Sequence, residues 1–293
     1  MSKLLITGAT GFLGSSLCRH LIASGHQLAA LVRPNSNLKK FQGLNIQLIE
    51  LAEYHELAAK VSQLNLDGVI HTACSYGRKG ESVQEVVEAN YLLGVALLQG
   101  CLRAGKPVVF LNTGTVLQSS VGIYAITKNQ FSELGMQLCA GSQAPNVQFI
   151  DIALQHMFGP GDDASKFTTH VIRSCLANVN DLPLTEGTQR RDFIYIDDVV
   201  HGYSTLLDQA GSLNKAERVE LGSGYAPTLR EFVEMVHQLS NSKTKLEFGA
   251  VPMRAGDTPI CVANTQRMQQ LGWSARYSLQ QGITKTIQME NKA

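Results

Sequence analysis

The sequence has 293 residues, of which 44% are hydrophobic and 17% charged, as in a soluble globular protein with a large core. Its 25 basic and 24 acidic residues leave a net charge of +1, without runs of like charge. This balance excludes a surface that binds nucleic acid or an anionic membrane as a whole.

Apolar runs of strand length alternate with stretches of helical periodicity from the first residues onward. The runs are apolar throughout, which is typical of parallel strands buried on both faces. Strands are predicted over 3–7, 26–33, 46–51, 68–73, 107–113 and 147–154, and helices over 12–25, 54–64, 84–105 and from about 124 to 140. This order predicts an α/β fold with a doubly wound, Rossmann-type parallel sheet that binds ligands at the carboxyl ends of its strands.

After about residue 156 the pattern loosens, with a strand-like segment at 190–200 and a clear helix at 227–239 capped by Thr228. We therefore expect two parts. They are a Rossmann domain over 1–155, with segments returning to it near 193–215 and 255–270, and a smaller, discontinuous substrate-binding lobe over 156–293.

The first strand and the first helix are joined by a loop with three glycines, Gly8, Gly11 and Gly14. Glycine permits a sharp turn there and lets a pyrophosphate approach the backbone, while the helix N-terminus supplies amide donors. The spacing, Gly-x-x-Gly-x-x-Gly, predicts a dinucleotide site. The loop residues Thr10, Phe12 and Leu13 belong to the same predicted site.

The end of the second strand reads "LVRPNS", without the acidic residue that would accept hydrogen bonds from an adenosine ribose. Arg33, followed by Asn35 and Ser36, is suited to pair with a 2′-phosphate. The segment favours NADP(H), and NAD(H) stays possible.

Tyr124 and Lys128 are separated by one helical turn, so both side chains leave the same face of a helix. An ammonium beside a phenol stabilises the phenolate and lowers the pKa of the phenol. Taken alone, the pair is either a proton-transfer device or an exposed aromatic–cation pair without chemical consequence.

Several short motifs occur in an order that resembles one known family. They are GATGFLG, HTAC, Asn90, Thr113 before Tyr124-x-x-x-Lys128, FGPGDD, RRDFIYIDD and RAGD. From Lys3 to about Gln288 the chain resembles the extended short-chain dehydrogenase/reductase family, in its NAD-dependent epimerase/dehydratase branch acting on nucleotide sugars.

The resemblance implies roles for matching positions. Tyr124 would be the acid/base, Lys128 would bind the nicotinamide ribose and lower the tyrosine pKa, and Thr113 would hydrogen-bond the substrate oxygen. Further residues would contact the cofactor, namely Glu50, Leu51, Thr72 and Ala73. Others would contact the substrate, namely His156, which stands where many relatives have Asn, and the arginines Arg191 and Arg254.

Two departures narrow the implied chemistry. Thr113 is followed by Gly114 and Thr115, where dehydratases of the family have Asp-Glu, and the loop to Tyr124 is short compared with 4-epimerases. The chain looks most similar to nucleotide-sugar 4-ketoreductases such as CDP-abequose and CDP-paratose synthases, which make deoxysugars for surface polysaccharide. The alternatives are an NAD-dependent nucleotide-sugar 4-epimerase and, more remotely, a non-catalytic NADP-binding regulator. The nucleotide, the sugar and its C4 configuration are not specified by the sequence.

Six widely spaced cysteines and eight histidines form no metal-ligand spacing, which predicts thiols in a reducing compartment and no metal site. The N-terminus lacks a signal-peptide core, and the longest uncharged apolar stretch is shorter than a membrane span. We expect a cytoplasmic protein. The resemblance implies a homodimer, and apolar residues on several faces of the helices at 84–105 and around 134–139 favour one.

Overall fold

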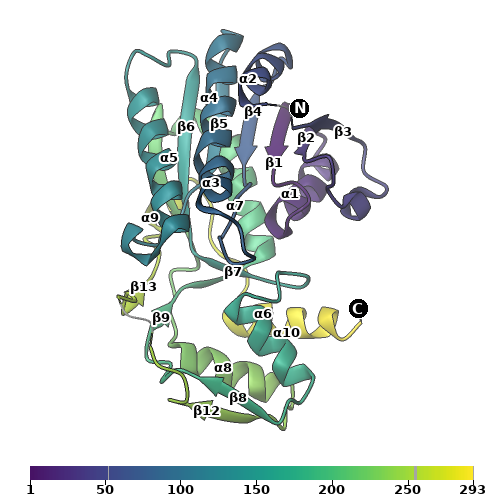
Figure 1. Ribbon diagram of the computed structural model, residues 1–293, viewed down its shortest axis with the longest axis vertical. Helices are drawn as coiled ribbons and strands as arrows, with labels where there is room; N and C mark the ends of the chain where they lie inside the picture. The colour runs from purple at the N-terminus through teal and green to yellow at the C-terminus, as the bar shows by residue number, and fades with distance from the viewer. Residues whose placement is uncertain (52, 254–255, 293) are drawn as a thin grey trace. The chain divides into compact units, whose positions relative to one another are not determined.

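Strands and helices alternate along the first 150 residues, as the apolar runs predict, and the result is a parallel sheet. The computed structural model describes residues 1–51, 53–253 and 256–292 (Figure 1). The chain divides into unit 1, formed by Met1–Ala153 and Tyr203–Val219, and unit 2, formed by Leu154–Gly202 and Glu220–Ala293. Residues 256–270 therefore belong to unit 2.

The sheet of unit 1 has seven strands in the order β11-β6-β5-β4-β1-β2-β3. Its strands are β1 (Lys3–Thr7), β2 (Gln27–Val32), β3 (Ile46–Glu50), β4 (Gly68–His71), β5 (Val108–Thr113), β6 (Val147–Leu154) and β11 (Ala216–Leu221). Neighbouring strands pair in parallel, for example Leu5 with Val69 and Val69 with Phe110. The order reverses on either side of β1, as in doubly wound sheets, and the predicted fold class is confirmed.

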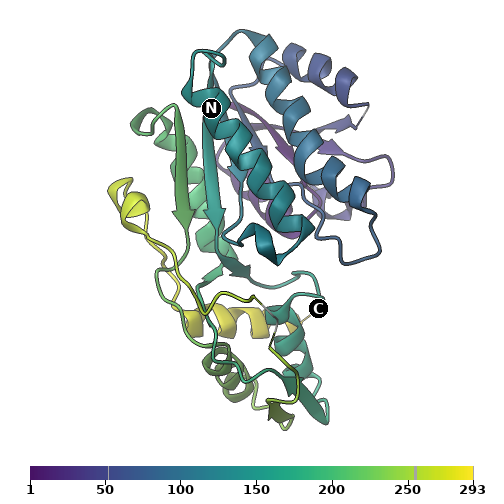
Figure 2. The same cartoon turned by 60° about the vertical axis from the view of Figure 1, so that its left-hand side comes forward.

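Helices cover both faces of this sheet (Figures 1 and 2). On one face lie α2 (Tyr54–Gln63), α4 (Leu93–Ala104) and α5 (Ile123–Ala140), which bury Leu57, Leu97 and Phe131 against the row Leu5, Ala29, Val69, Phe110 and Phe149. On the other face α1 (Phe12–Ala23) packs on β1 and β2, and Leu207 of α7 (Ile196–Asp208) lies beside Gly68. Burial from both sides explains the uninterrupted apolar runs.

The long helix predicted over 84–105 is interrupted by a π-helical turn. It consists of α3 (Val83–Val87), the π turn Glu88–Leu92 and then α4, which ends at Gly105 with φ of +69°. Asn90 in the π turn is fully buried. Its amide accepts a hydrogen bond from Ser75 N at 2.7 Å and donates to Ser75 O at 2.9 Å and to Thr127 Oγ1 at 3.1 Å. The turn therefore ties the loop after β4 to α5.

By length and composition alone, Val83–Ala104 is the one described stretch that qualifies as a membrane span. Half of its most apolar window is buried inside the structure. Its helix α4 packs along α2 on the sheet. A core helix of a soluble protein has these same properties, so the stretch is weak support for a membrane span.

Unit 2 contains short paired strands and several helices. The strands are β7 (His156–Phe158), β8 (Asp181–Leu184), β9 (Arg190–Arg191), β10 (Phe193–Tyr195), β12 (Lys245–Phe248) and β13 (Ile260–Cys261), and the helices are α6 (Phe167–Leu176), α8 (Leu229–Leu239), α9 (Gln266–Gln270) and α10 (Leu279–Glu290). Aromatic rings form its core, with the ring of Phe232 4.4 Å from that of Phe193. Thr228 caps α8 in a capping box with Glu231, which confirms the predicted cap.

The prediction of a strand over 190–200 is wrong for the second half of that segment. After β9 and β10 the chain enters α7 at Ile196, so Asp197 and Asp198 lie in the first turn of a helix. Negative charge is favourable at a helix N-terminus. Asp198 also accepts hydrogen bonds from Arg276 N at 2.9 Å and Tyr277 N at 3.1 Å. These distant partners are not visible in the local apolar pattern.

Candidate active site

The glycine loop between β1 and α1 is packed so closely that side chains do not fit. Gly8 has φ of +62°, and a Cβ on it would lie 2.7 Å from Ala73 N. A Cβ on Gly14 would lie 2.2 Å from Gly8 O, and one on Gly11 would lie 3.0 Å from the same oxygen. The loop is thus a bare backbone surface leading into a helix N-terminus, which suits a pyrophosphate.

The end of β4 is held against this loop by Thr7. The Thr7 hydroxyl accepts a hydrogen bond from Ala73 N at 3.2 Å and pairs with His71 Nδ1 at 2.8 Å. Thr72 Oγ1 donates to Thr7 O at 2.7 Å. The structure therefore brings Thr72 and Ala73 together with the glycines, as the resemblance implies for residues beside a cofactor.

The first turn of α1 begins at Phe12, with Gly11 at the N-cap and no side chain capping it. Phe12 is half-buried, and the Leu13 side chain is 4% exposed. Leu13 therefore packs in the core and presents only its backbone N–H to the loop. Its predicted contact with a cofactor is restricted to that amide.

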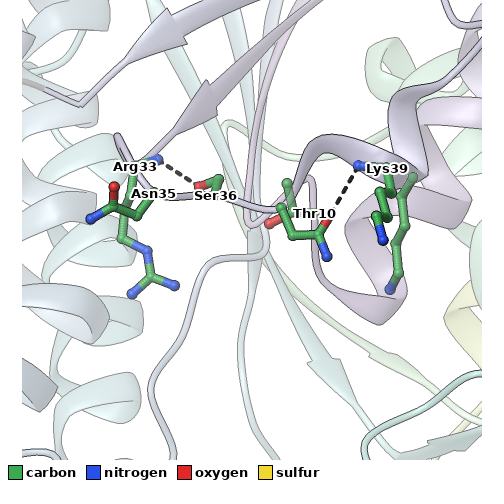
Figure 3. A pocket seen from close by; sticks show the side chains of 7 residues that line it. Thr10, Arg33, Asn35, Ser36 and Lys39 are labelled. Atoms are coloured by element: carbon green, nitrogen blue, oxygen red, sulfur yellow. Dashed lines mark hydrogen bonds between the residues drawn. The ribbon is translucent and has the colours of Figure 1, made fainter.

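A pocket of about 300 Å³ lies after β2, beside the glycine loop. It is lined by Thr10, Arg33, Asn35, Ser36, Asn37, Lys39 and Lys40 (Figure 3). The Ser36 hydroxyl accepts a hydrogen bond from Arg33 N at 2.9 Å, and Asn37 Oδ1 accepts one from Lys39 N at 3.0 Å. Lys40 Nζ reaches Gly11 O at 3.5 Å. Sequence reasoning found the arginine but missed both lysines, which lie on the 3-10 turn Leu38–Phe41.

Glu50 and Leu51 lie at the carboxyl end of β3, next to the end of β2. Leu51 N donates a hydrogen bond to Val32 O at 2.8 Å, and Glu50 is exposed. The two residues therefore lie one strand away from Arg33. Their contact with an adenine remains a prediction.

Lys128 is carried by α5 and is 1% exposed. Its Nζ has no hydrogen-bond partner among the described residues. Burial lowers the pKa of Lys128, while Cys74 and Asp151 act in the opposite direction. A buried ammonium without a partner is unfavourable unless a ligand accepts its hydrogen bonds, and the hydroxyls of a nicotinamide ribose fit that need.

Tyr124 lies one turn before Lys128, and its ring stacks on Tyr76 with the centroids 4.7 Å apart. The expectation that its pKa is lowered by Lys128 differs from the structure. Burial raises the pKa of Tyr124, Cys74 raises it further, and a hydrogen bond from the Thr115 side chain and the charge of Arg78 lower it. Removal of the phenol from water outweighs the nearby charges, so the group is held protonated, which is the form that donates a proton.

The hydroxyls at the end of β5 have different partners. Thr113 Oγ1 is 2.6 Å from the hydroxyl of Tyr203, a fully buried residue of α7. Thr115, two residues on, is 5% exposed, and its side chain lies close enough to the Tyr124 phenol to lower the pKa of that phenol. Sequence reasoning used Thr115 only as evidence against a carboxylate. A second threonine two residues after Thr113 was the signal in the sequence that could have identified Thr115 as a site residue.

Two of the residues predicted to contact the substrate, His156 and Arg191, lie in unit 2. Arg191 Nη2 donates to Asp257 Oδ1 at 2.5 Å and Nη1 donates to Thr258 O at 2.7 Å, so its guanidinium is held by the chain itself. Burial and the charge of Arg191 lower the pKa of His156 to about 4. His156 Nδ1 is buried without a hydrogen-bond partner among the described residues. Arg254 lies outside the described residues.

Two independent observations indicate that the residues of unit 1 fit a nicotinamide dinucleotide. The glycine loop leaves a backbone cradle that a Cβ would fill, and the ammonium of Lys128 is buried without a hydrogen-bond partner in the described part of the chain. A Rossmann sheet with a tyrosine–lysine pair on α5 is the arrangement of a dinucleotide-dependent oxidoreductase.

The chain belongs to the NAD dependent epimerase/dehydratase family, whose sequence model matches residues 4–222. It is 32% identical to the CDP-abequose synthase of Salmonella muenchen over 98% of both chains. It is 27% identical to the CDP-abequose synthase of Salmonella typhimurium, over 97% of this chain and 96% of that one. The family resemblance is thereby confirmed, and the protein is an enzyme of the oxidoreductase type.

Solved structures agree on the fold. The UDP-glucose 4-epimerase of Thermotoga maritima, solved with UDP-glucose, superposes with a TM-score of 0.84 at 18% identity, covering 99% of each chain. The UDP-glucose 4-epimerase of Thermus thermophilus, in complex with NAD, gives a TM-score of 0.82 at 20% identity, again covering 99% of each chain. At these identities the likeness concerns the fold alone.

Proposed function

We propose that the protein reduces the C4 keto group of a nucleotide-linked 4-keto-6-deoxyhexose with NADPH, in the biosynthesis of a deoxysugar for surface polysaccharide. The similarity to two CDP-abequose synthases over nearly the whole chain supports the substrate class. The observation that carries the chemistry is the pair on α5, a protonated phenol one turn from a buried ammonium that has no hydrogen-bond partner among the residues described.

In this mechanism, bound NADPH supplies the hydride that reduces the carbonyl carbon. Tyr124 donates its phenolic proton to the oxygen as negative charge develops on it. The Thr115 hydroxyl, which lies next to the phenol, orients it. Lys128 donates hydrogen bonds to the ribose hydroxyls and places a positive charge near the phenolate left after proton transfer.

In unit 2, His156 and Arg191 are proposed to bind the substrate diphosphate. His156 is neutral at physiological pH, because its pKa is about 4, and its buried Nδ1 is available to a ligand. Arg191 is fixed by Asp257, which orders the guanidinium before a ligand arrives.

The test of substrate class uses the wild-type enzyme with NADPH and CDP-, dTDP-, GDP- or UDP-linked 4-keto-6-deoxyhexoses. We expect loss of NADPH absorbance with at least one of them and a 4-hydroxy product. Without turnover of any keto sugar, the proposed function is wrong.

A nucleotide-sugar 4-epimerase is the second candidate, because the same tyrosine–lysine pair serves an oxidation followed by re-reduction. The loop 114–123 lacks the length expected of an epimerase, and the cationic pocket after β2 favours a cofactor with a 2′-phosphate. Such a cofactor argues for reduction, because the epimerase alternative uses NAD.

The pocket after β2 predicts a preference for NADPH over NADH. Arg33, Lys39 and Lys40 line it, and a 2′-phosphate carries the negative charge that they attract. Arg33→Asp should weaken NADPH binding by about 2 kcal/mol, roughly 30-fold, and shift preference toward NADH. Titration of both cofactors by protein fluorescence measures this preference, with Arg103→Asp, at an exposed position of α4, as the control. Equal affinity of the wild type for both cofactors would refute the assignment.

We also propose a cytoplasmic homodimer formed through the helical stretch Val83–Ala104 and α5. A groove of about 580 Å³ is lined by Val87, Tyr91, Leu92, Gln130, Glu133, Leu134 and Gln137, and Leu92 is 39% exposed. Light scattering at micromolar concentration should give a dimer for the wild type and a monomer for Leu92→Arg. Val83→Arg, at a 67% exposed position outside the groove, should remain a dimer. A monomeric, active wild type argues against this interface.

A further inference from the structure

A buried carboxylate, that of Asp151, lies in unit 1 on β6, the strand paired with β5, and has no role assigned above. Asp151 on β6 is fully buried. Its Oδ1 accepts hydrogen bonds from Asn112 Nδ2 at 2.7 Å and from Ser132 Oγ at 2.6 Å. Its Oδ2 is paired with Arg218 Nη1 from β11. Three elements, β5, α5 and β11, therefore meet at one carboxylate.

The same arginine holds the turn that follows β5. Arg218 Nη2 donates a hydrogen bond to Thr115 O at 2.9 Å. Gly114 N donates to Ile152 O at 2.8 Å, and a Cβ on Gly114 would lie 2.6 Å from Asp151 Oδ1. Gly114 therefore packs directly against the Asp151 carboxylate, and the carbonyl of the next residue, Thr115, is held by the Arg218 guanidinium.

This turn carries the Thr115 hydroxyl, which lies next to the phenol of Tyr124 and lowers the pKa of that phenol. Thr115 Oγ1 also accepts a hydrogen bond from Leu117 N at 3.2 Å, so its side chain is fixed from within the turn. The negative charge of Asp151 acts on Lys128 as well, whose pKa it raises against the effect of burial. The Arg218–Asp151 pair thus affects the environment of both Tyr124 and Lys128, the two side chains of the proposed proton transfer.

Stability alone explains this ion pair poorly. Arg218 is 44% exposed at the side chain, whereas Asp151 is completely buried, so the carboxylate has lost its hydration without a fully desolvated partner. Ion pairs of this kind are often no more stable than apolar residues of the same volume. The need for a fixed geometry of the turn 113–115 explains the Arg218–Asp151 pair better.

We propose that Arg218 and Asp151 are positioning residues for the proposed reduction: the pair fixes the turn 113–115 and thereby holds the Thr115 hydroxyl on Tyr124. The inference rests on the proposed function for its rate measurement. It does not depend on which nucleotide sugar is the substrate.

The kinetic test compares Arg218→Met with Arg218→Lys and the control Arg103→Met. We expect Arg218→Met to lower kcat by a factor on the order of 10², because the turn loses its fixed position, with KM for NADPH and keto sugar changed less than about twofold. Arg218→Lys keeps the charge but not the two-pronged contact, and it should recover part of kcat. If Asp151 without its partner prevents folding, Arg218→Gln combined with Asp151→Asn removes both charges. A folded variant with wild-type kcat would mean that the pair is only structural.

A second readout needs no substrate. The enzyme is labelled with tyrosine carrying ¹³C at Cζ, and the Tyr124 resonance is assigned by its absence in Tyr124→Phe. Thr115→Val and Arg218→Met should move this resonance in the same direction, and Arg103→Met should leave it in place. If the resonance moves but the wild type reduces no keto sugar, the proposed substrate fails and the positioning role stands. If the wild type is an active reductase and neither kcat nor the resonance responds to Arg218→Met, the positioning role is refuted.

Discussion

Tyr124→Phe should lower turnover by about 10²- to 10⁴-fold while leaving NADPH affinity near that of the wild type. The phenol is the proposed proton donor, and a positioned general acid contributes a factor of this size. The phenylalanine ring keeps the stacking on Tyr76 and loses only the hydroxyl that lies next to the Thr115 side chain. The free energy of unfolding should therefore change by no more than about 1 kcal/mol.

Steady-state kinetics and a cofactor titration on the same preparation measure both quantities. Tyr225→Phe, at a 56% exposed position in unit 2, is the matched control and should retain turnover. Near-normal kcat in Tyr124→Phe would remove the phenol from the mechanism.

Lys128→Met should abolish measurable turnover and weaken NADPH binding, yet raise the stability of the unliganded enzyme. The ammonium is buried without a hydrogen-bond partner among the described residues. Burial lowers the pKa of Lys128 in the folded protein below its usual value of 10.5. The neutral amine therefore favours the folded state above pH 10.5, and this stability is lost as the pH falls from there through the folded-state pKa. At neutral pH the charged form therefore opposes folding, and methionine should recover about 1–3 kcal/mol.

Urea unfolding at pH 7.5 without cofactor tests this opposition between stability and activity. Lys106→Met is the matched control, because Lys106 Nζ pairs with Asp67 Oδ1 at 2.9 Å at the surface. Its loss should lower the free energy of unfolding by up to about 1 kcal/mol. A less stable Lys128→Met enzyme would show that the ammonium is well satisfied inside the protein.

The sheet and the glycine loop are predictable from the sequence because their signals are local. Six of the seven strands follow apolar runs such as 68–73, which are separated from one another by helix-length segments. The seventh strand, β11, carries Glu217, Arg218 and Glu220, and its sequence does not predict it. Gly8 and Gly14 are required by contacts that always accompany a tight strand-to-helix turn. Local patterns of this kind survive in any doubly wound sheet.

The finer parts of the site depend on contacts between distant residues, so the sequence pattern does not contain them. Arg218 meets Thr115 across 103 positions of the chain, and Thr113 meets Tyr203 across 90. The raised pKa of Tyr124 follows from burial, which depends on the packing of the whole unit. Lys39 and Lys40 enter the pocket only because a 3-10 turn folds back toward the glycine loop.

The direction of the reaction is tested most directly by isotope transfer. The wild-type enzyme is incubated with a nucleotide-linked 4-keto-6-deoxyhexose and NADPH that carries deuterium at its transferable position, and the product is analysed by mass spectrometry and NMR. A 4-ketoreductase should consume one NADPH per product and place one deuterium on C4 of the sugar. Interconversion of C4 epimers of a nucleotide hexose without net consumption of NADPH, in an enzyme that retains NAD, would contradict the account.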